Sequence, residues 1–198
     1  MGLAPVKETV GAVRDVFIKV FELFTGGFTI AKPNGFTGGV NLPKGSFLKV
    51  DESARTATPI KTALTADTPA GASGIYLPLG HPFIATDVIA LEGQSTSSAI
   101  DVVENQATKS YIRVEAAFTD TGAATGTVVY QAASAGTTPA ALAPKDVPNG
   151  ILRYDTTLAT GEEATVALRA SVYKNRLPDA HTSAHRADLK LIHFSDSK

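Results

Sequence analysis

Apolar and polar side chains alternate most clearly in residues 149–177. A short apolar run at 151–154 follows the turn signal Asn149-Gly150, and residues 165–172 then alternate apolar and polar side chains. A period of two is typical of a strand with one buried face. Residues 159–163 separate the two runs and supply the Gly and polar residues that a reversing loop needs. The pattern predicts a β-hairpin with a scaffold role and no catalytic residue.

Apolar runs of the same kind recur about every eight to twelve residues between positions 75 and 131. In one of them, Ile112 and Val114 alternate with Tyr111, Arg113 and Glu115. Regular short strands with turn signals between them are typical of a barrel or sandwich. We therefore expect a mainly β chain whose body is a small β-barrel or sandwich. The predicted strands of this body are residues 75–79, 83–91, 98–103, 110–118 and 126–131.

The N-terminal region fits two periodicities. Valine and phenylalanine side chains in residues 6–24 fall at helical spacing, whereas residues 16–21 alternate at strand spacing. The β-branched content, Gly11 and the lack of a good N-cap favour extended structure. In residues 26–45 Gly and Pro recur every few positions, which limits regular elements to about four residues. We therefore expect an extended, Gly- and Phe-rich N-terminal arm.

Phenylalanines are concentrated in this predicted arm. A long exposed aromatic run is costly and favours aggregation. The rings therefore either pack within the chain or lie on another molecule, and the sequence leaves both alternatives open. The candidate contacts with a partner are the five phenylalanines of this region, Phe17, Phe21, Phe24, Phe28 and Phe36.

The chain divides by composition into three segments. Small, flexible residue types at positions 66–74 predict a linker between the arm and the body. A hairpin is expected within the arm, from strands at 42–50 and 57–64. Residues 132–147, rich in Ala, Thr and Pro, predict an exposed projecting loop that contains at most one helical turn. The predicted segments are residues 1–65 (arm and short hairpin), 66–178 (β-rich body) and 179–198 (polar tail with a further strand at 189–194).

Composition excludes several classes of function. The chain of 198 residues has no Cys, which rules out disulfides, thiolate zinc sites and a cysteine nucleophile. Its formal net charge of −1 and lack of a basic block argue against nucleic-acid binding. No run of about 18 apolar residues is present, so we expect neither a membrane span nor a signal peptide. Charge is uneven along the chain: residues 62–131 carry two basic and seven acidic side chains, a net of −5. Residues 1–61 carry eight basic and five acidic side chains, and residues 132–198 carry eight basic and seven acidic side chains.

Few side chains offer catalytic or metal-binding chemistry. His181 and His185 are spaced i and i+4, but they lack the glutamate of an HExxH motif and lie among residues that form helices poorly. We expect His81, in a Gly-His-Pro turn, to hydrogen-bond a nearby backbone group, because no nucleophile motif accompanies it. We therefore expect no enzyme, no cofactor and no small-molecule substrate. Two carboxylate pairs in turns are more typical of solvated loops than of a glycosidase, namely Asp101 with Glu104 and Glu162 with Glu163.

The predicted hairpin resembles a known structural family. Residues 149–155 and 166–177 are similar to the closing hairpin of head decoration proteins of tailed bacteriophages, although Ala170 and Tyr173 stand where that pattern often has glycine and asparagine. Residues 75–91 look like the phage head-fibre group. This resemblance implies an auxiliary protein on the capsid exterior of a virion. It also implies a homotrimer whose N-terminal arm orders on the major capsid protein and cements it.

A second class of function stays open. A surface binding module, either an adhesin or a carbohydrate-binding β-domain, would need exposed aromatic platforms. The chain has no Trp, and its five tyrosines fall mostly in predicted strands. The capsid hypothesis therefore ranks above the binding module.

Overall fold

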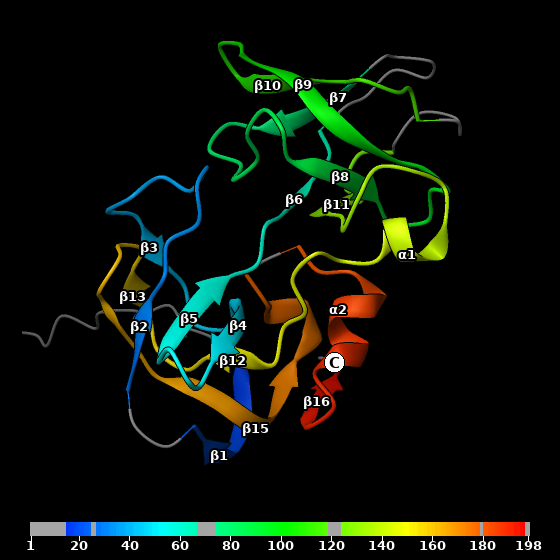
Figure 1. Cartoon of the computed structure of the whole chain (residues 1–198). Coiled ribbons are helices and arrows are strands. Elements are labelled where there is room, and N and C mark those ends of the chain that lie inside the picture. The colour runs from blue at the N-terminus through cyan, green and yellow to red at the C-terminus, as the bar shows by residue number, and fades with distance from the viewer. Residues whose placement is uncertain (1–14, 25–26, 67–73, 119–123, 179, 197–198) are drawn as a thin grey trace, which may run out of the picture.

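The protein has two lobes, each built on a β-sheet (Figure 1). The computed structural model describes residues 15–24, 27–66, 74–118, 124–178 and 180–196. A six-stranded sheet forms the lobe at the top of Figure 1, which we call the barrel lobe. An eight-stranded sheet and a two-stranded sheet form the other, which we call the sheet lobe. The expected mainly β fold with a small barrel-like body is confirmed.

The barrel lobe comes from one continuous stretch of chain. Its neighbouring strands are all antiparallel, in the order β6-β11-β8-β9-β10-β7. The sheet curls until its two end strands meet, and the Ala66 N–H donates a hydrogen bond of 2.7 Å to the Tyr76 carbonyl. The strands are β6 (Thr62–Leu64), β7 (Gly74–Pro78), β8 (Val88–Leu91), β9 (Ser97–Asn105), β10 (Lys109–Val114) and β11 (Val128–Gln131).

Alternation along the strands fills this barrel. In β10 the side chains of Ile112 and Val114 are buried, and those of Tyr111 and Arg113 face outward, as the period of two predicts. Gly74 lies beneath the Tyr111 ring, where a Cβ atom would stand 2.2 Å from the Ile112 carbonyl oxygen. Only glycine fits at this position, so the close approach of β7 and β10 depends on it.

The sheet lobe combines the two ends of the chain. Its order is β1-β15-β12-β4-β5-β2-β14, and β16 pairs with β15 in parallel. Beside it, β3 (Asn41–Leu42) pairs with β13 (Thr156–Thr157). The strands of the large sheet are β1 (Phe17–Leu23), β2 (Phe28–Ile30), β4 (Phe47–Asp51), β5 (Thr56–Pro59), β12 (Gly150–Leu152), β14 (Glu163–Ala164), β15 (Val166–Tyr173) and β16 (Ile192–Ser195).

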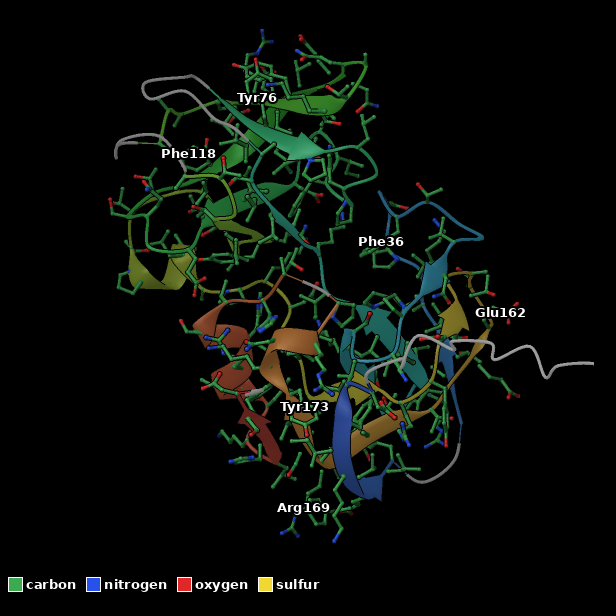
Figure 2. All side chains as sticks on the ribbon, turned by 180° about the vertical axis from the view of Figure 1, so that it is seen from behind. Phe36, Tyr76, Phe118, Glu162, Arg169 and Tyr173 are labelled. Carbon is green, nitrogen blue, oxygen red and sulfur yellow. The ribbon has the colours of Figure 1, made fainter. Side chains whose placement is uncertain are left out.

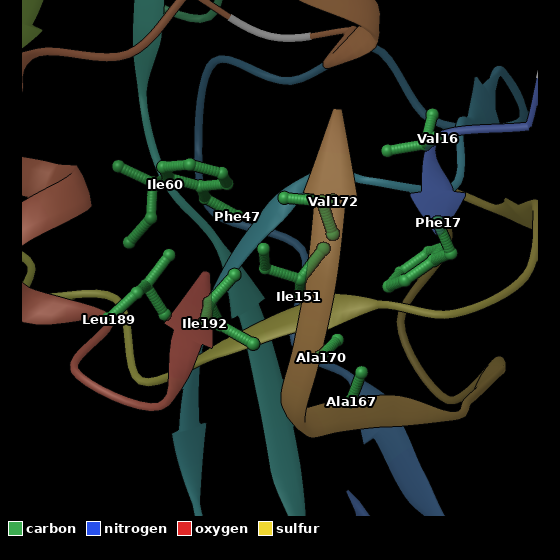
Figure 3. Packing of buried hydrophobic residues seen from close by; sticks show 10 residues of the cluster. All are labelled: Val16, Phe17, Phe47, Ile60, Ile151, Ala167, Ala170, Val172, Leu189 and Ile192. Atoms are coloured by element: carbon green, nitrogen blue, oxygen red, sulfur yellow. The ribbon is translucent and has the colours of Figure 1, made fainter. Parts of the chain in front are cut away.

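The hairpin predicted at residues 149–177 is confirmed. Strand β12 pairs antiparallel with β15, with Ile151 opposite Ala167. Figure 3 shows Ile151 and Val172 in the core between β1 on one side and β16 on the other. The buried residues of this cluster are Val16, Phe17, Phe47, Ile60, Ile151, Ala167, Ala170, Val172, Leu189 and Ile192. The hairpin is therefore the central scaffold of the sheet lobe.

The predicted division into residues 1–65, 66–178 and 179–198 does not follow the sheets. Strands β1, β2, β4 and β5 of the predicted arm and β16 of the predicted tail belong to the same sheet as β12 and β15. Strands that are far apart in the sequence pair with each other because their apolar faces share one core. Local composition carries no information about such pairing. Extended structure is confirmed for Phe17–Leu23. Residues 6–14, and most of the linker predicted at 66–74, lie outside the described residues.

The loop at residues 132–147 and the tail carry the helices. Helix α1 (Pro139–Leu142) is the single turn expected in the loop. The loop does not project freely, because the Tyr130 hydroxyl donates to the Leu142 carbonyl at 2.7 Å and the Lys145 N–H donates to the Gln131 carbonyl at 2.9 Å. The tail contains helix α2 (Ser183–Asp188) before β16, and η1 (Lys174–Arg176) follows β15. No helix in the described part of the chain is long and apolar enough to cross a membrane.

Candidate functional site

The five candidate phenylalanines lie in different environments. Phe17 and Phe28 are buried in the two cores of the sheet lobe. Phe24 packs edge-on against Phe28, with ring centroids 5.5 Å apart, and Phe36 packs against the same core. Phe21 is 52% exposed. Of the five rings, Phe21 is therefore the one that presents most of its surface to a partner without a change in the core.

Strand β1 carries Phe21 at an edge of the sheet. Among the described strands β1 pairs only with β15, so one side of its backbone has no strand beside it. Ile18 and Leu23 are also exposed, by 46% and 41%. These three residues are a third of the nine large apolar side chains that are exposed in the described structure. Apolar side chains gathered on an open strand edge are typical of an interaction surface.

A groove of about 370 Å³ lies beside Phe21 and runs across β15 to β16. Arg169, Lys190 and His193 line it together with Leu191, which is 52% exposed. The Lys19 ammonium and the Arg169 guanidinium lie 4.9 and 5.6 Å from the centre of the Phe21 ring, within cation–π range. We call this surface the docking face and define it as Ile18, Lys19, Phe21, Leu23, Arg169, Lys190, Leu191 and His193.

The docking face is at one end of the molecule. Figure 2 shows Arg169 at the end of the sheet lobe that points away from the barrel lobe, with Tyr76 at the opposite end. Of this surface, the sequence indicated only Phe21. Alternation along β15 placed Arg169 opposite the apolar positions, but no local pattern connects Lys190 or His193 with β1. Their proximity arises because β16 pairs with β15.

A buried ion pair lies at the junction of the two lobes, where the chain passes from β5 to β6. The Lys61 ammonium lies 2.7 Å from the Asp87 carboxylate, which also accepts hydrogen bonds from the Gln131 amide at 2.8 Å and from the Ile84 N–H at 3.1 Å. Lys61, Asp87 and Gln131 are all less than 9% exposed. Since both carboxylate oxygens are hydrogen-bonded and the charges compensate each other, the arrangement is suited to holding the lobes together. Neighbouring Thr86 adopts a positive φ of 78° and donates its N–H to the Ile100 carbonyl.

His185 takes part in the folding of α2. The Thr182 side chain caps the helix by accepting from the His185 N–H at 3.1 Å, and the Thr182 N–H points to His185 Nδ1 at 3.4 Å. This reciprocal capping explains why a helix forms where residue propensities disfavoured one. The ring is buried edge-on against Tyr130, at 5.9 Å, and burial lowers its pKa to about 4. His181 lies outside the helix, beside Phe47.

The other histidine and the carboxylates considered for catalysis have roles in local structure or lie exposed to solvent. His81 accepts a hydrogen bond from the Phe83 N–H at 3.2 Å, which confirms the expected turn, and burial lowers its pKa. Asp101 forms an exposed ion pair with Arg113 at 2.7 Å. Glu104, Glu162 and Glu163 are exposed. Among the described residues, no group of three or more His, Cys, Asp and Glu side chains is arranged to hold a metal ion.

We compared the chain with protein-family models, curated proteins and solved structures, and none of these comparisons found a match.

Proposed function

We propose that this protein is an auxiliary structural protein that decorates and stabilises the capsid of a tailed phage. Its partner in this proposal is the major capsid protein, on the exterior of the head. The proposal rests on the resemblance of residues 149–155 and 166–177 to head decoration proteins, and on one structural observation. Strand β1 is an open edge with three exposed large apolar side chains, Ile18, Phe21 and Leu23. Such a surface is suited to binding another protein.

Docking through this face has a direct consequence for stability of the particle. A protein that binds only assembled capsid subunits shifts the equilibrium toward the assembled state. If three copies act together, their contacts raise the effect through a high effective concentration. Because the docking face is at the end of the sheet lobe, such binding leaves the barrel lobe pointing away from the capsid surface (Figure 2).

The test is co-sedimentation of the protein with heads of the same virus that lack it. We expect Phe21→Ser to abolish co-sedimentation, because the substitution removes the largest exposed apolar side chain of the docking face without touching the core. The matched control is Leu79→Ser, which changes a side chain of similar exposure (49%) in the barrel lobe. Binding by Phe21→Ser as strong as that of the unsubstituted protein rejects this docking face.

The length of an N-terminal deletion decides what it tests. Removing residues 1–61 would delete β1, β2, β4 and β5 and destroy the sheet lobe, so loss of binding would say nothing about docking. Deletion of residues 1–14 leaves every described strand intact and tests their contribution separately. If residues 1–14 also contribute to docking, we expect their deletion to weaken co-sedimentation, whereas Phe21→Ser abolishes it.

A second candidate function, a carbohydrate-binding module, is favoured by a pair of tyrosines on the barrel lobe. Tyr76 and Tyr111 are direct neighbours across β7 and β10, with ring centroids 5.1 Å apart, and the Lys109 ammonium lies 3.6 Å from the Tyr76 ring centre. Aromatic rings beside polar groups are typical of sugar sites. Specific binding on a glycan array, lost in Tyr76→Ala, would support this function. An array without hits rejects it.

A further inference from the structure

We infer that the docking face binds an acidic, extended polypeptide segment of its partner. This inference rests on the proposed function, because it takes the partner to be the protein surface on which β1 docks. It adds the chemistry of that surface, namely carboxylate side chains together with apolar ones. Three properties of the docking face support it: the charge of the groove, the apolar side chains around it, and the open edge of β1.

The groove beside Phe21 is cationic. Its lining includes Arg169, Lys190 and His193 and, among the described residues, no carboxylate. Elsewhere in the described structure Lys44, Lys49, Lys61 and Arg113 form ion pairs with aspartates.

Within the same residues, Lys19, Arg169 and Lys190 form no ion pair. Glu22 stands opposite Arg169 in the strand pairing but does not bond to it. The face therefore presents cations that an incoming carboxylate can neutralise.

The apolar side chains favour a polypeptide over a purely ionic polymer. Phe21 and Leu191 line the groove together with its cations, and Ile18 and Leu23 of the same strand β1 are also more than 40% exposed. A nucleic acid or a sulfated polysaccharide would neutralise the cations and leave these side chains in water. One polypeptide segment can carry both carboxylates and apolar side chains, so it can neutralise the cations and cover the apolar groups together. Its backbone also finds hydrogen-bond partners on the open edge of β1.

The inference is tested on the full chain in solution, without heads. The probe is a short, capped, fluorescent peptide of alternating Glu and Val, and the control probe carries Lys in place of Glu. We expect the acidic peptide to bind, with an affinity that falls as salt is raised, and the basic peptide not to bind. Equal binding of both peptides, or of neither, overturns the inference.

A pair of charge reversals locates the site. Lys190→Glu changes the groove, and Lys145→Glu makes the same change of charge at an exposed lysine on the loop before β12. We expect Lys190→Glu to weaken binding of the acidic peptide about tenfold or more and Lys145→Glu to leave it unchanged. Equal effects of the two variants show that only net charge matters and overturn the inference.

Two further measurements separate the alternatives. Binding of heparin in preference to the acidic peptide, lost in Lys190→Glu, assigns the face to an anionic polysaccharide and overturns the inference. A doubling or tripling of the solution mass that Lys190→Glu abolishes assigns the face to the acidic barrel lobe of a second copy, and also overturns the inference.

Binding to heads separates the inference from the proposed function. If Phe21→Ser weakens binding to heads but Lys190→Glu does not, the proposed function is retained and the acidic partner is rejected. Peptide binding without binding to heads rejects the capsid and retains the acidic ligand.

Discussion

The two lobes differ in how the edges of their sheets are arranged. The barrel lobe curls until β6 and β7 meet through the Ala66–Tyr76 hydrogen bond. The sheet lobe stays open, and its strand order ends at β1 and at β14. Closure removes the row of backbone groups that a further strand could pair with, whereas an open edge keeps it. This difference is the reason we propose that a partner docks on the sheet lobe and not on the barrel lobe.

The largest expected effect concerns the contact between the lobes. Lys61→Ala leaves the Asp87 carboxylate buried without its cation, and we expect the free energy of unfolding to fall by about 4 kcal/mol. The control is Arg113→Ala, which breaks an ion pair of the same length, 2.7 Å, between half-exposed side chains. It should cost at most about 1 kcal/mol. Urea unfolding measures both, and similar losses would show that the lobes do not depend on the buried pair.

Two phenylalanines of β1 separate stability from docking. Phe17→Ala removes a ring that is 7% exposed, and we expect a loss of about 3 kcal/mol. Phe21→Ala changes a ring that is 52% exposed, and its effect on stability should stay within about 0.5 kcal/mol. Thermal unfolding of both variants checks this. An equal loss would mean that the outward face of β1 is needed for the fold and would weaken its assignment to a partner.

The pH dependence of stability tests the contact between α2 and the barrel lobe. Burial lowers the pKa of His185 from 6.5 to about 4; His181 and Arg186 lower it further, and the Glu92 carboxylate partly opposes the shift. The unfolded chain therefore binds the proton first as the pH falls. The contribution of neutral His185 is fully present above about pH 6.5 and is lost between 6.5 and 4, by about 2 to 3 kcal/mol.

His185→Gln is the matched variant for this measurement. A glutamine keeps the capping box with Thr182 and does not titrate. We expect a flatter curve of unfolding free energy against pH between 4 and 6.5. An unchanged slope would assign the acid sensitivity to other groups.

The smallest effect concerns the loop that follows the barrel lobe. Tyr130→Phe removes the hydroxyl that donates to the Leu142 carbonyl, and we expect a loss of about 1 kcal/mol. Tyr154→Phe, at a ring that is 56% exposed, serves as the control and should change stability by less. Hydrogen exchange at Leu142 and its neighbours reports whether the loop itself loosens. Unchanged exchange would mean that its backbone bonds alone hold it.

Local periodicity was sufficient for the barrel lobe and for the closing hairpin. The alternation of the apolar run at 110–118 places Ile112 inside and Tyr111 outside, as the structure has them. These features depend on neighbours along the chain. The pairing of β1 with β15 depends instead on a shared core between segments almost 150 residues apart, so no local pattern predicts it.

The faces of β1 show a second limit of sequence reasoning. Strict alternation would put Phe17 and Phe21 on the same side of the strand, since four residues separate them. One is buried and the other exposed because the register shifts by one residue between Phe17 and Lys19, before Phe21 is reached. A bulge turns the following side chains to the other face. The candidate site was therefore predictable as a group of phenylalanines, but the one suited to docking was not.

The order in which strands leave the ribosome follows from the interleaved sheet lobe. Strand β1 is made roughly 10 to 30 seconds before β15 at ordinary rates of synthesis, and the whole barrel lobe emerges in the interval. The barrel strands have all their partners within that stretch, so the sheet of the barrel lobe needs no later part of the chain. Strand β1 lacks its partner β15, and β4 lacks one of its two partners, β12, until these are made. Slower translation after β11 therefore prolongs exposure of the N-terminal strands, and it is these strands that a chaperone would hold.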